Sequence, residues 1–165
     1  MKITFQGKEV HLEGVPLTVG AKAQNFSGTK PDLSTWSLSD AGSTVKIISA
    51  VPSLDTPICD IQTKRFNKEA ASLEGVTVVT VSVDLPFAQA RWCGAANANS
   101  HIVLSDYAEK DFGKKFGAFV TELKLLARAV FVLDKDNIVK YVQYVPEIAS
   151  EPNYEAALNA AKSLL

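Results

Sequence analysis

The sequence predicts an α/β fold in which helices flank a central mixed β-sheet. Two runs rich in β-branched residues, 45–51 and 76–83, indicate strands that are buried on both faces. A helical segment follows each of these runs, as expected of crossover connections between parallel strands. A short turn at 134–137 joins the last two apolar runs and makes them an antiparallel pair.

The N-terminal part predicts a β-hairpin followed by turn-rich chain. Residues 3–12 alternate apolar and polar side chains around a turn at 6–8. Phe26 is expected in a short strand that enters the core. The next segment, 33–42, brings two more apolar side chains ahead of the 45–51 strand, Trp36 and Leu38.

A long helix is expected to start close to Cys59, after the 45–51 strand and a loop. Its predicted inner face comprises Ile58, Ile61, Phe66, Ala70 and Leu73. The 76–83 strand follows, and residues 87–95 predict a short helix that carries Trp92 and Cys93.

The second half of the chain predicts three strands and two helices. The strands are 101–104, 127–133 and 138–145, and a helix interrupted by glycines is expected at 107–119. A closing helix at 153–165 has an inner stripe of Tyr154, Leu158, Ala161 and Leu165. The order of these elements is thioredoxin-like in outline, and the absence of repeats and linkers predicts one domain over 1–165.

Composition excludes several classes of function. The chain has 165 residues, 47% of them hydrophobic, which suffices for one sizeable core. Its net charge of −1 gives no electrostatic case for binding nucleic acid or an anionic membrane. No apolar run approaches the roughly 18 residues of a membrane span. The N-terminus lacks the apolar core of a signal peptide, so we expect a soluble cytoplasmic protein.

Cys59 is placed where a nucleophile is expected. It stands in the first turn of a helix that leaves a buried strand, and helix N-termini favour a thiolate over a thiol. The alternative is that Cys59 is simply a small buried apolar residue, as most isolated cysteines are.

Arg128 lies inside an apolar run that should be buried. An unpartnered buried guanidinium is costly, so an anionic group is expected close to it. One possibility is an ion pair with a carboxylate. The other places Arg128 beside the Cys59 thiolate, where it would also stabilise charge on a departing oxygen.

Cys93 follows Cys59 by 34 positions, which excludes a C-x-x-C redox motif. The two histidines, His11 and His101, have no zinc-ligand spacing to either cysteine, so no metal site is expected. Cys93 is either a packed apolar residue beside Trp92 or the thiol that resolves a sulfenic acid. In the second case, local unwinding of one or both helices is expected before a disulfide forms.

Three motifs resemble those of the peroxiredoxins, and specifically the atypical two-cysteine thiol peroxidase subfamily of bacteria. They are the segments PSLDTPIC at 52–59, DLPFAQARWCG at 84–94 and LLARAVFVLD at 125–134. The resemblance covers essentially the whole chain, including the N-terminal hairpin. It implies a thioredoxin-like peroxiredoxin fold and reduction of hydrogen peroxide and organic hydroperoxides without a cofactor.

The resemblance also implies a role for individual residues and for partners. Cys59 would be the peroxidatic cysteine and Cys93 the resolving one, with an intramolecular disulfide that thioredoxin reduces. Pro52, Thr56 and Arg128 would complete the peroxide pocket. A homodimer is implied as well, with exposed Trp92 or Phe87 as a source of apolar contact.

Two further features qualify this picture. Pro57 stands where the subfamily more often has glycine; proline suits the first turn of a helix, and it would slow local unwinding. Three apolar side chains are candidates either for lining a site for bulky hydroperoxides or for plain core packing: Leu54, Phe87 and Trp92.

Three other functions remain open on the residues alone. A thiol-disulfide oxidoreductase would need a vicinal dithiol, which the chain lacks. A redox sensor would use the same two cysteines without turnover. A plain binding domain would have two inert cysteines.

Overall fold

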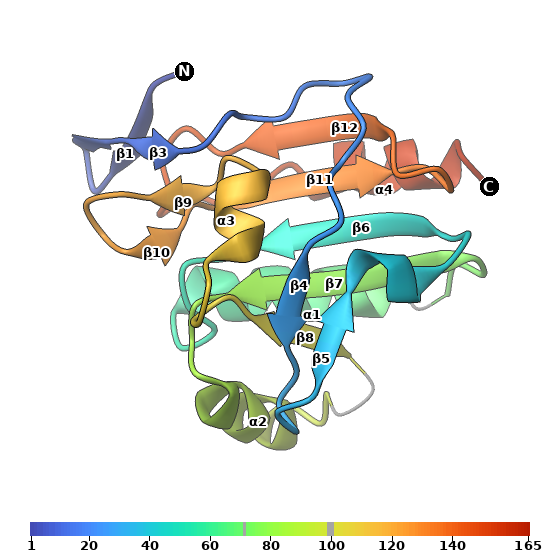
Figure 1. Ribbon diagram of the computed structural model, residues 1–165, viewed down its shortest axis with the longest axis horizontal. Coiled ribbons are helices and arrows are strands. Elements are labelled where there is room, and N and C mark those ends of the chain that lie inside the picture. The colour runs from blue at the N-terminus through green and yellow to red at the C-terminus, as the bar shows by residue number, and fades with distance from the viewer. Residues whose placement is uncertain (71, 99–100) are drawn as a thin grey trace.

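The computed structural model describes residues 1–70, 72–98 and 101–165. Within them, the largest element is a seven-stranded mixed sheet in the order β12-β11-β6-β7-β8-β4-β5 (Figure 1). The strands are β4 (Ser27–Thr29), β5 (Thr35–Ser37), β6 (Val45–Ala50), β7 (Val76–Ser82), β8 (Ile102–Ser105), β11 (Ala129–Leu133) and β12 (Val139–Tyr144). Strands β6, β7 and β8 are parallel, whereas β11 is antiparallel to β6 and β12.

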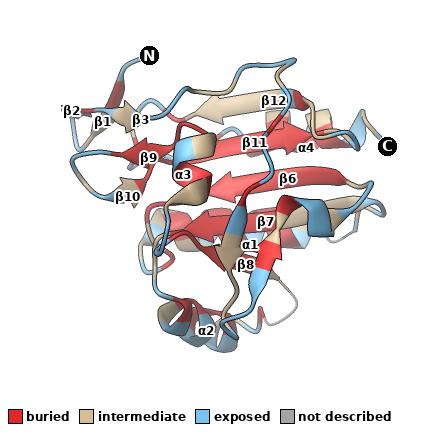
Figure 2. Ribbon diagram, in the orientation of Figure 1, coloured by how far each residue is buried: buried red, intermediate tan, exposed pale blue. Residues whose placement is uncertain are grey.

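The central strands are buried on both faces and are mostly apolar, although β6 also buries Lys46 and Ser49. Every residue of β6 and of β11 is buried, as the red strands of Figure 2 show. Strand β6 lies between β7 and β11, and both of its faces are covered by other elements.

Helices cover both faces of this sheet. On one face lie α1 (Pro57–Ala70) and α4 (Tyr154–Lys162), which meet through the rings of Phe66 and Tyr154 at 5.3 Å. The other face is covered by α3 (Asp111–Lys115), a 3₁₀ helix (Leu38–Ala41) and an aromatic cluster. That cluster contains Phe26, Phe112, Phe116 and Phe131. Helix α2 (Pro86–Ala95) packs against β8 (Figure 1).

The N-terminal hairpin is present, apart from the main sheet. It consists of β1 (Ile3–Phe5) and β2 (Lys8–Val10), joined by Gln6 and Gly7, whose φ angles are 51° and 79°. The hairpin is joined to the C-terminal part by Thr4, whose N–H donates to the carbonyl of Pro146 at 2.7 Å. A second small sheet contains β3 (Leu12–Glu13), β9 (Phe119–Val120) and β10 (Leu125–Leu126).

The predicted fold class is confirmed, and several local predictions are wrong. The expected helix at 107–119 is reduced to α3, because Lys110 and Gly117 have left-handed backbone with φ of 55° and 60°. Its last residues instead enter β9. None of the described helices is long and apolar enough to cross a membrane.

Two helix faces also differ from the expectation. On α1, Ile61 is 46% exposed, and the inner positions next to it are taken by Gln62 and Thr63. Leu73 follows the described part of α1, and residue 71, within the predicted helix, lies outside the described residues. Helix α4 ends at Lys162, so Leu165 is exposed and does not belong to its inner stripe.

Candidate active site

Cys59 lies in the first turn of α1, as predicted. Pro57 is the first residue of the helix, a position at which proline loses no hydrogen bond. Thr56 precedes it: its hydroxyl donates to the Ser53 carbonyl at 3.0 Å, and its own carbonyl accepts from Asp60 N–H at 3.0 Å. The Cys59 side chain is fully buried.

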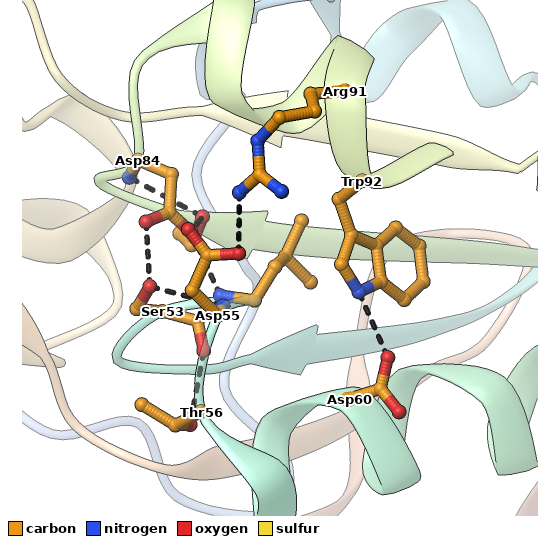
Figure 3. A network of polar contacts seen from close by, with 9 residues as sticks. Ser53, Asp55, Thr56, Asp60, Asp84, Arg91 and Trp92 are labelled. Carbon is orange, nitrogen blue, oxygen red and sulfur yellow. Dashed lines mark hydrogen bonds and ion pairs between the residues drawn. The ribbon is translucent and has the colours of Figure 1, made fainter. Parts of the chain in front are cut away.

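The loop before α1 is held by one carboxylate that follows the neighbouring strand β7. Asp84, just after β7, accepts hydrogen bonds from the Ser53 hydroxyl at 2.7 Å and from the Leu54 N–H at 2.8 Å. The Ser82 hydroxyl donates to the same carboxylate at 2.7 Å. Figure 3 shows this network beside Thr56. Asp84 therefore fixes the loop that contains Thr56 against the carboxyl end of β7.

Arg128 is buried just before β11, and its partners are neutral. Its Nε donates to the carbonyl of Ile148 at 2.7 Å, and its Nη1 donates to Gln62 Oε1 at 2.9 Å. Gln62 is held in turn by donating to the Ser49 hydroxyl at 2.7 Å. Among the described residues no carboxylate lies within ion-pair distance of Arg128, so the first of the two possibilities, an ion pair with a carboxylate, is wrong. The guanidinium keeps its positive charge uncompensated by any of these partners.

Three of the predicted site residues meet at one pocket. Pro52, Thr56 and Arg128 line a cavity of about 280 Å³ at the N-terminus of α1. Its lining is mostly apolar and comes from segments far apart in the chain, with Phe5 from β1, Leu125 from β10 and Ile148. Ile58, directly before Cys59, also borders it. The pocket thus brings a cation and a hydroxyl to the helix end that carries the cysteine.

Cys93 lies in α2 and shares a buried apolar cluster with Cys59. The other members are Val51, Leu54, Trp92, Ala98 and Val103. Both cysteines are free thiols. Burial raises the pKa of the Cys93 thiol, so this group stays protonated near neutral pH.

The three candidates for a lining of the substrate site do not line the pocket. Leu54 and Trp92 are buried in the cysteine cluster, which agrees with core packing. Phe87 is 67% exposed on α2. Because Trp92 is only 6% exposed, it is not the exposed dimer contact that we expected.

Two side-chain contacts join α2 to the start of α1. Arg91 Nη2 lies 2.6 Å from Asp55 Oδ1, and Trp92 Nε1 donates to Asp60 Oδ1 at 2.9 Å. Figure 3 shows both side chains reaching from α2 toward these carboxylates. The described residues contain no group of three His, Cys, Asp or Glu placed to hold a metal.

Comparison with known proteins agrees with this geometry. Residues 18–158 match the family model described as Redoxin. The chain is 54% identical to a thiol peroxidase of Streptococcus pneumoniae (strain R6), over 98% of this chain and 99% of that protein. It is 49% identical to a thiol peroxidase of Bacillus subtilis (strain 168), over 99% and 98% of the two chains. The chain belongs to the redoxin family and, within it, to the thiol peroxidases.

Solved structures of this family share the fold. A peroxiredoxin-like protein from Aquifex aeolicus superposes with a TM-score of 0.93 at 42% identity, covering 99% of this chain and 97% of that one. A thiol peroxidase from Chromobacterium violaceum gives a TM-score of 0.89 at 18% identity, covering 99% and 96%.

Sequence reasoning missed several members of this redoxin site. Gln62, Asp84 and Ile148 hold the site together, yet none of them was singled out. A glutamine on the apolar side of a predicted helix was the available signal for Gln62, because a buried amide requires a partner. Ile148 acts through its backbone carbonyl, which leaves no signature in the sequence.

Proposed function

We propose that this chain is a thiol-dependent peroxidase in which Cys59 reduces hydrogen peroxide and organic hydroperoxides and Cys93 resolves the product. The observation that carries the proposal is the meeting of Thr56, Pro52 and an uncompensated Arg128 at the helix end that bears Cys59. A buried positive charge in the pocket stabilises the negative charge that develops on the departing oxygen in the transition state.

The first step is nucleophilic displacement on oxygen. The Cys59 thiolate attacks the nearer oxygen of ROOH, the O–O bond breaks, and Cys59 becomes a sulfenic acid while RO⁻ leaves. Arg128 and the Thr56 hydroxyl, both in the pocket, orient the peroxide and stabilise the departing oxygen, which takes up a proton to give ROH.

The second step forms a disulfide between the two cysteines. The sulfur of Cys93 attacks the Cys59 sulfenic acid, the S–O bond breaks, and water leaves with the Cys93 proton. We propose that thioredoxin then reduces this disulfide. One domain over 1–165 carries the whole cycle, and dependence on thioredoxin favours a cytoplasmic location.

The composition of the pocket supports organic substrates. Phe5, Leu125 and Ile148 provide apolar surface for an alkyl group, whereas hydrogen peroxide needs only Thr56 and Arg128. We also propose a homodimer, with exposed Phe87 as a source of contact. Analytical ultracentrifugation of the wild-type protein tests the dimer, and a monomer mass at micromolar concentration would contradict it.

The decisive test of the reaction is turnover of cumene hydroperoxide, followed as NADPH consumption with thioredoxin and its reductase. Wild type, Cys59→Ser and Cys93→Ser are compared. We expect turnover in wild type, none in Cys59→Ser, and a loss or sharp fall in Cys93→Ser. Peroxide consumption retained by Cys59→Ser would overturn the mechanism. One fast loss of both thiols without turnover would instead favour a redox sensor.

A further inference from the structure

Helix α2 is attached to the rest of the molecule in two different ways. Near its start, the buried Gln89 donates to the Ser82 hydroxyl at 3.0 Å and to the Leu104 carbonyl at 2.9 Å, which fixes this half on the sheet. Farther along, Arg91 and Trp92 contact α1 and its preceding loop through side chains alone. Within this second attachment the Arg91–Asp55 pair is the weaker contact, because the two side chains are 64% and 54% exposed.

The orientation of α2 determines which of its side chains faces α1. Consecutive residues of an α-helix point about 100° apart. Trp92 is directed at Asp60 of α1, whereas Cys93 borders another cavity whose wall includes Lys30 and Asp32, from the segment after β4. In this arrangement Trp92, and not Cys93, presents its polar group to the helix of the peroxidatic cysteine.

Both cysteines are free thiols in this arrangement, and we expect disulfide formation to change it. A disulfide requires the two Cβ atoms to approach to about 4 Å with their bonds directed at each other. Turning Cys93 toward Cys59 rotates this half of α2 about its axis and carries Arg91 and Trp92 away from their partners. We therefore expect the contacts of Arg91 with Asp55 and of Trp92 with Asp60 to break before the sulfurs meet.

We propose that these two contacts form an interhelix latch whose release limits the rate of disulfide formation. The residues Arg91, Trp92, Asp55 and Asp60 act as positioning residues for the resolving step, and the inference rests on the proposed roles of Cys59 and Cys93. While the latch is closed, Cys59 keeps its place in the first turn of α1, whose start borders the pocket, and reacts with peroxide. The latch thereby sets the lifetime of the sulfenic acid and its exposure to a second peroxide.

The test is a single turnover of the reduced protein with one equivalent of peroxide. Dimedone trapping measures the sulfenic acid, and alkylation with mass spectrometry measures the disulfide. Trp92→Phe keeps the buried ring and removes the donor, and we expect disulfide formation to be about tenfold faster. Arg91→Gln removes an exposed pair, and we expect a two- to fivefold gain, roughly what such pairs contribute. Sulfenic acid formation should be unchanged in both.

Lys64→Gln is the matched control. Lys64 pairs with Asp60 at 3.0 Å but lies on α1 itself, so its loss weakens the same carboxylate's contacts without freeing α2. We expect its resolving rate to equal that of wild type. High salt should speed disulfide formation in wild type and leave its rate in Arg91→Gln unchanged, because salt screens the exposed Arg91–Asp55 pair but not the hydrogen bond from Trp92 to Asp60.

The outcomes separate this inference from the proposed function. Equal or slower disulfide formation in Trp92→Phe and Arg91→Gln, with a wild type that forms the disulfide, overturns the latch alone. A wild type that forms sulfenic acid but no Cys59–Cys93 disulfide overturns both. Faster resolution with less overoxidation in excess peroxide supports the latch, and thermal unfolding verifies that each variant is folded.

Discussion

Gln62 is the residue through which we expect the reactivity of the pocket to be tuned. It is fully buried, accepts from Arg128 Nη1 at 2.9 Å and donates to the Ser49 hydroxyl at 2.7 Å. Gln62→Ala removes a bond to a charged donor, worth about 1.5–3 kcal/mol, and a neutral bond worth about 1 kcal/mol. We expect the free energy of unfolding to fall by about 2.5–4 kcal/mol and Arg128 to lose its orientation.

The sharper perturbation is Gln62→Glu, which preserves shape and changes only charge. A glutamate accepts from the same Arg128 N–H, and the Ser49 hydroxyl can turn to donate to its other oxygen. Stability should stay within about 1 kcal/mol of wild type. Two opposite charges about 4 Å apart interact by about 4 kcal/mol at an effective dielectric of 20. If half of this interaction energy, about 2 kcal/mol, no longer stabilises the negative charge on the departing oxygen, the rate of attack falls about 30-fold.

The assay is stopped-flow reaction of the reduced protein with excess hydroperoxide, read as loss of the Cys59 thiol, with urea unfolding in parallel. Ile61→Glu is the control, because it adds the same charge to the exposed side of the same helical turn. We expect its rate to match wild type. A folded Gln62→Glu protein that reacts at the wild-type rate would show that the charge of Arg128 has no part in the chemistry.

Three further outcomes are expected. Glu147 accepts hydrogen bonds from N–H groups of the hairpin turn and of Ala149, and these bonds lower its pKa. Glu147→Ala removes them and should loosen the pocket wall. We expect kcat/KM to fall severalfold for cumene hydroperoxide and to change little for hydrogen peroxide. Asp84→Ala should lower the free energy of unfolding by about 2–3 kcal/mol and slow the reaction of Cys59, measured by urea unfolding and thiol loss. Burial raises the pKa of Asp106 from 3.8 to about 6, so its ionised form weakens the fold at pH 7 and protonation removes the penalty. From pH 7 to 4, wild type should therefore gain about 2.4 kcal/mol relative to Asp106→Asn in urea unfolding, and a difference independent of pH would contradict this.

The architecture could be predicted because its signals are local. The β-branched run at the centre of the sheet predicts a strand, and the proline at the start of α1 predicts a helix start, each from a few consecutive residues. The helix expected over 107–119 failed for a reason that is also local. Its apolar spacing was helical, but the left-handed backbone of Lys110 and Gly117 ends a helix on either side of α3.

The candidate site could be predicted only in part, because most of its support is made by tertiary contacts. Cys59, Thr56 and Arg128 were predicted from their positions and motifs, and the structure places Thr56 and Arg128 at one pocket at the start of α1, the helix that carries Cys59. Helical periodicity favoured Ile61 for the inner face, yet the buried position went to Gln62 because Arg128 needs an acceptor there. Which of two adjacent residues a helix buries depends on the side chains that pack against that helix in the fold.

The pocket wall joins the first strand of the chain to the segment around Ile148. Phe5 lies on one side of it, and the carbonyl of Ile148 positions the guanidinium on the other. On the ribosome, Cys59 is made long before the segment that orients Arg128. The nascent chain thus carries Cys59 before the residues that complete the pocket wall, and the pocket is complete only when the segment around Ile148 packs beside Phe5 of the hairpin.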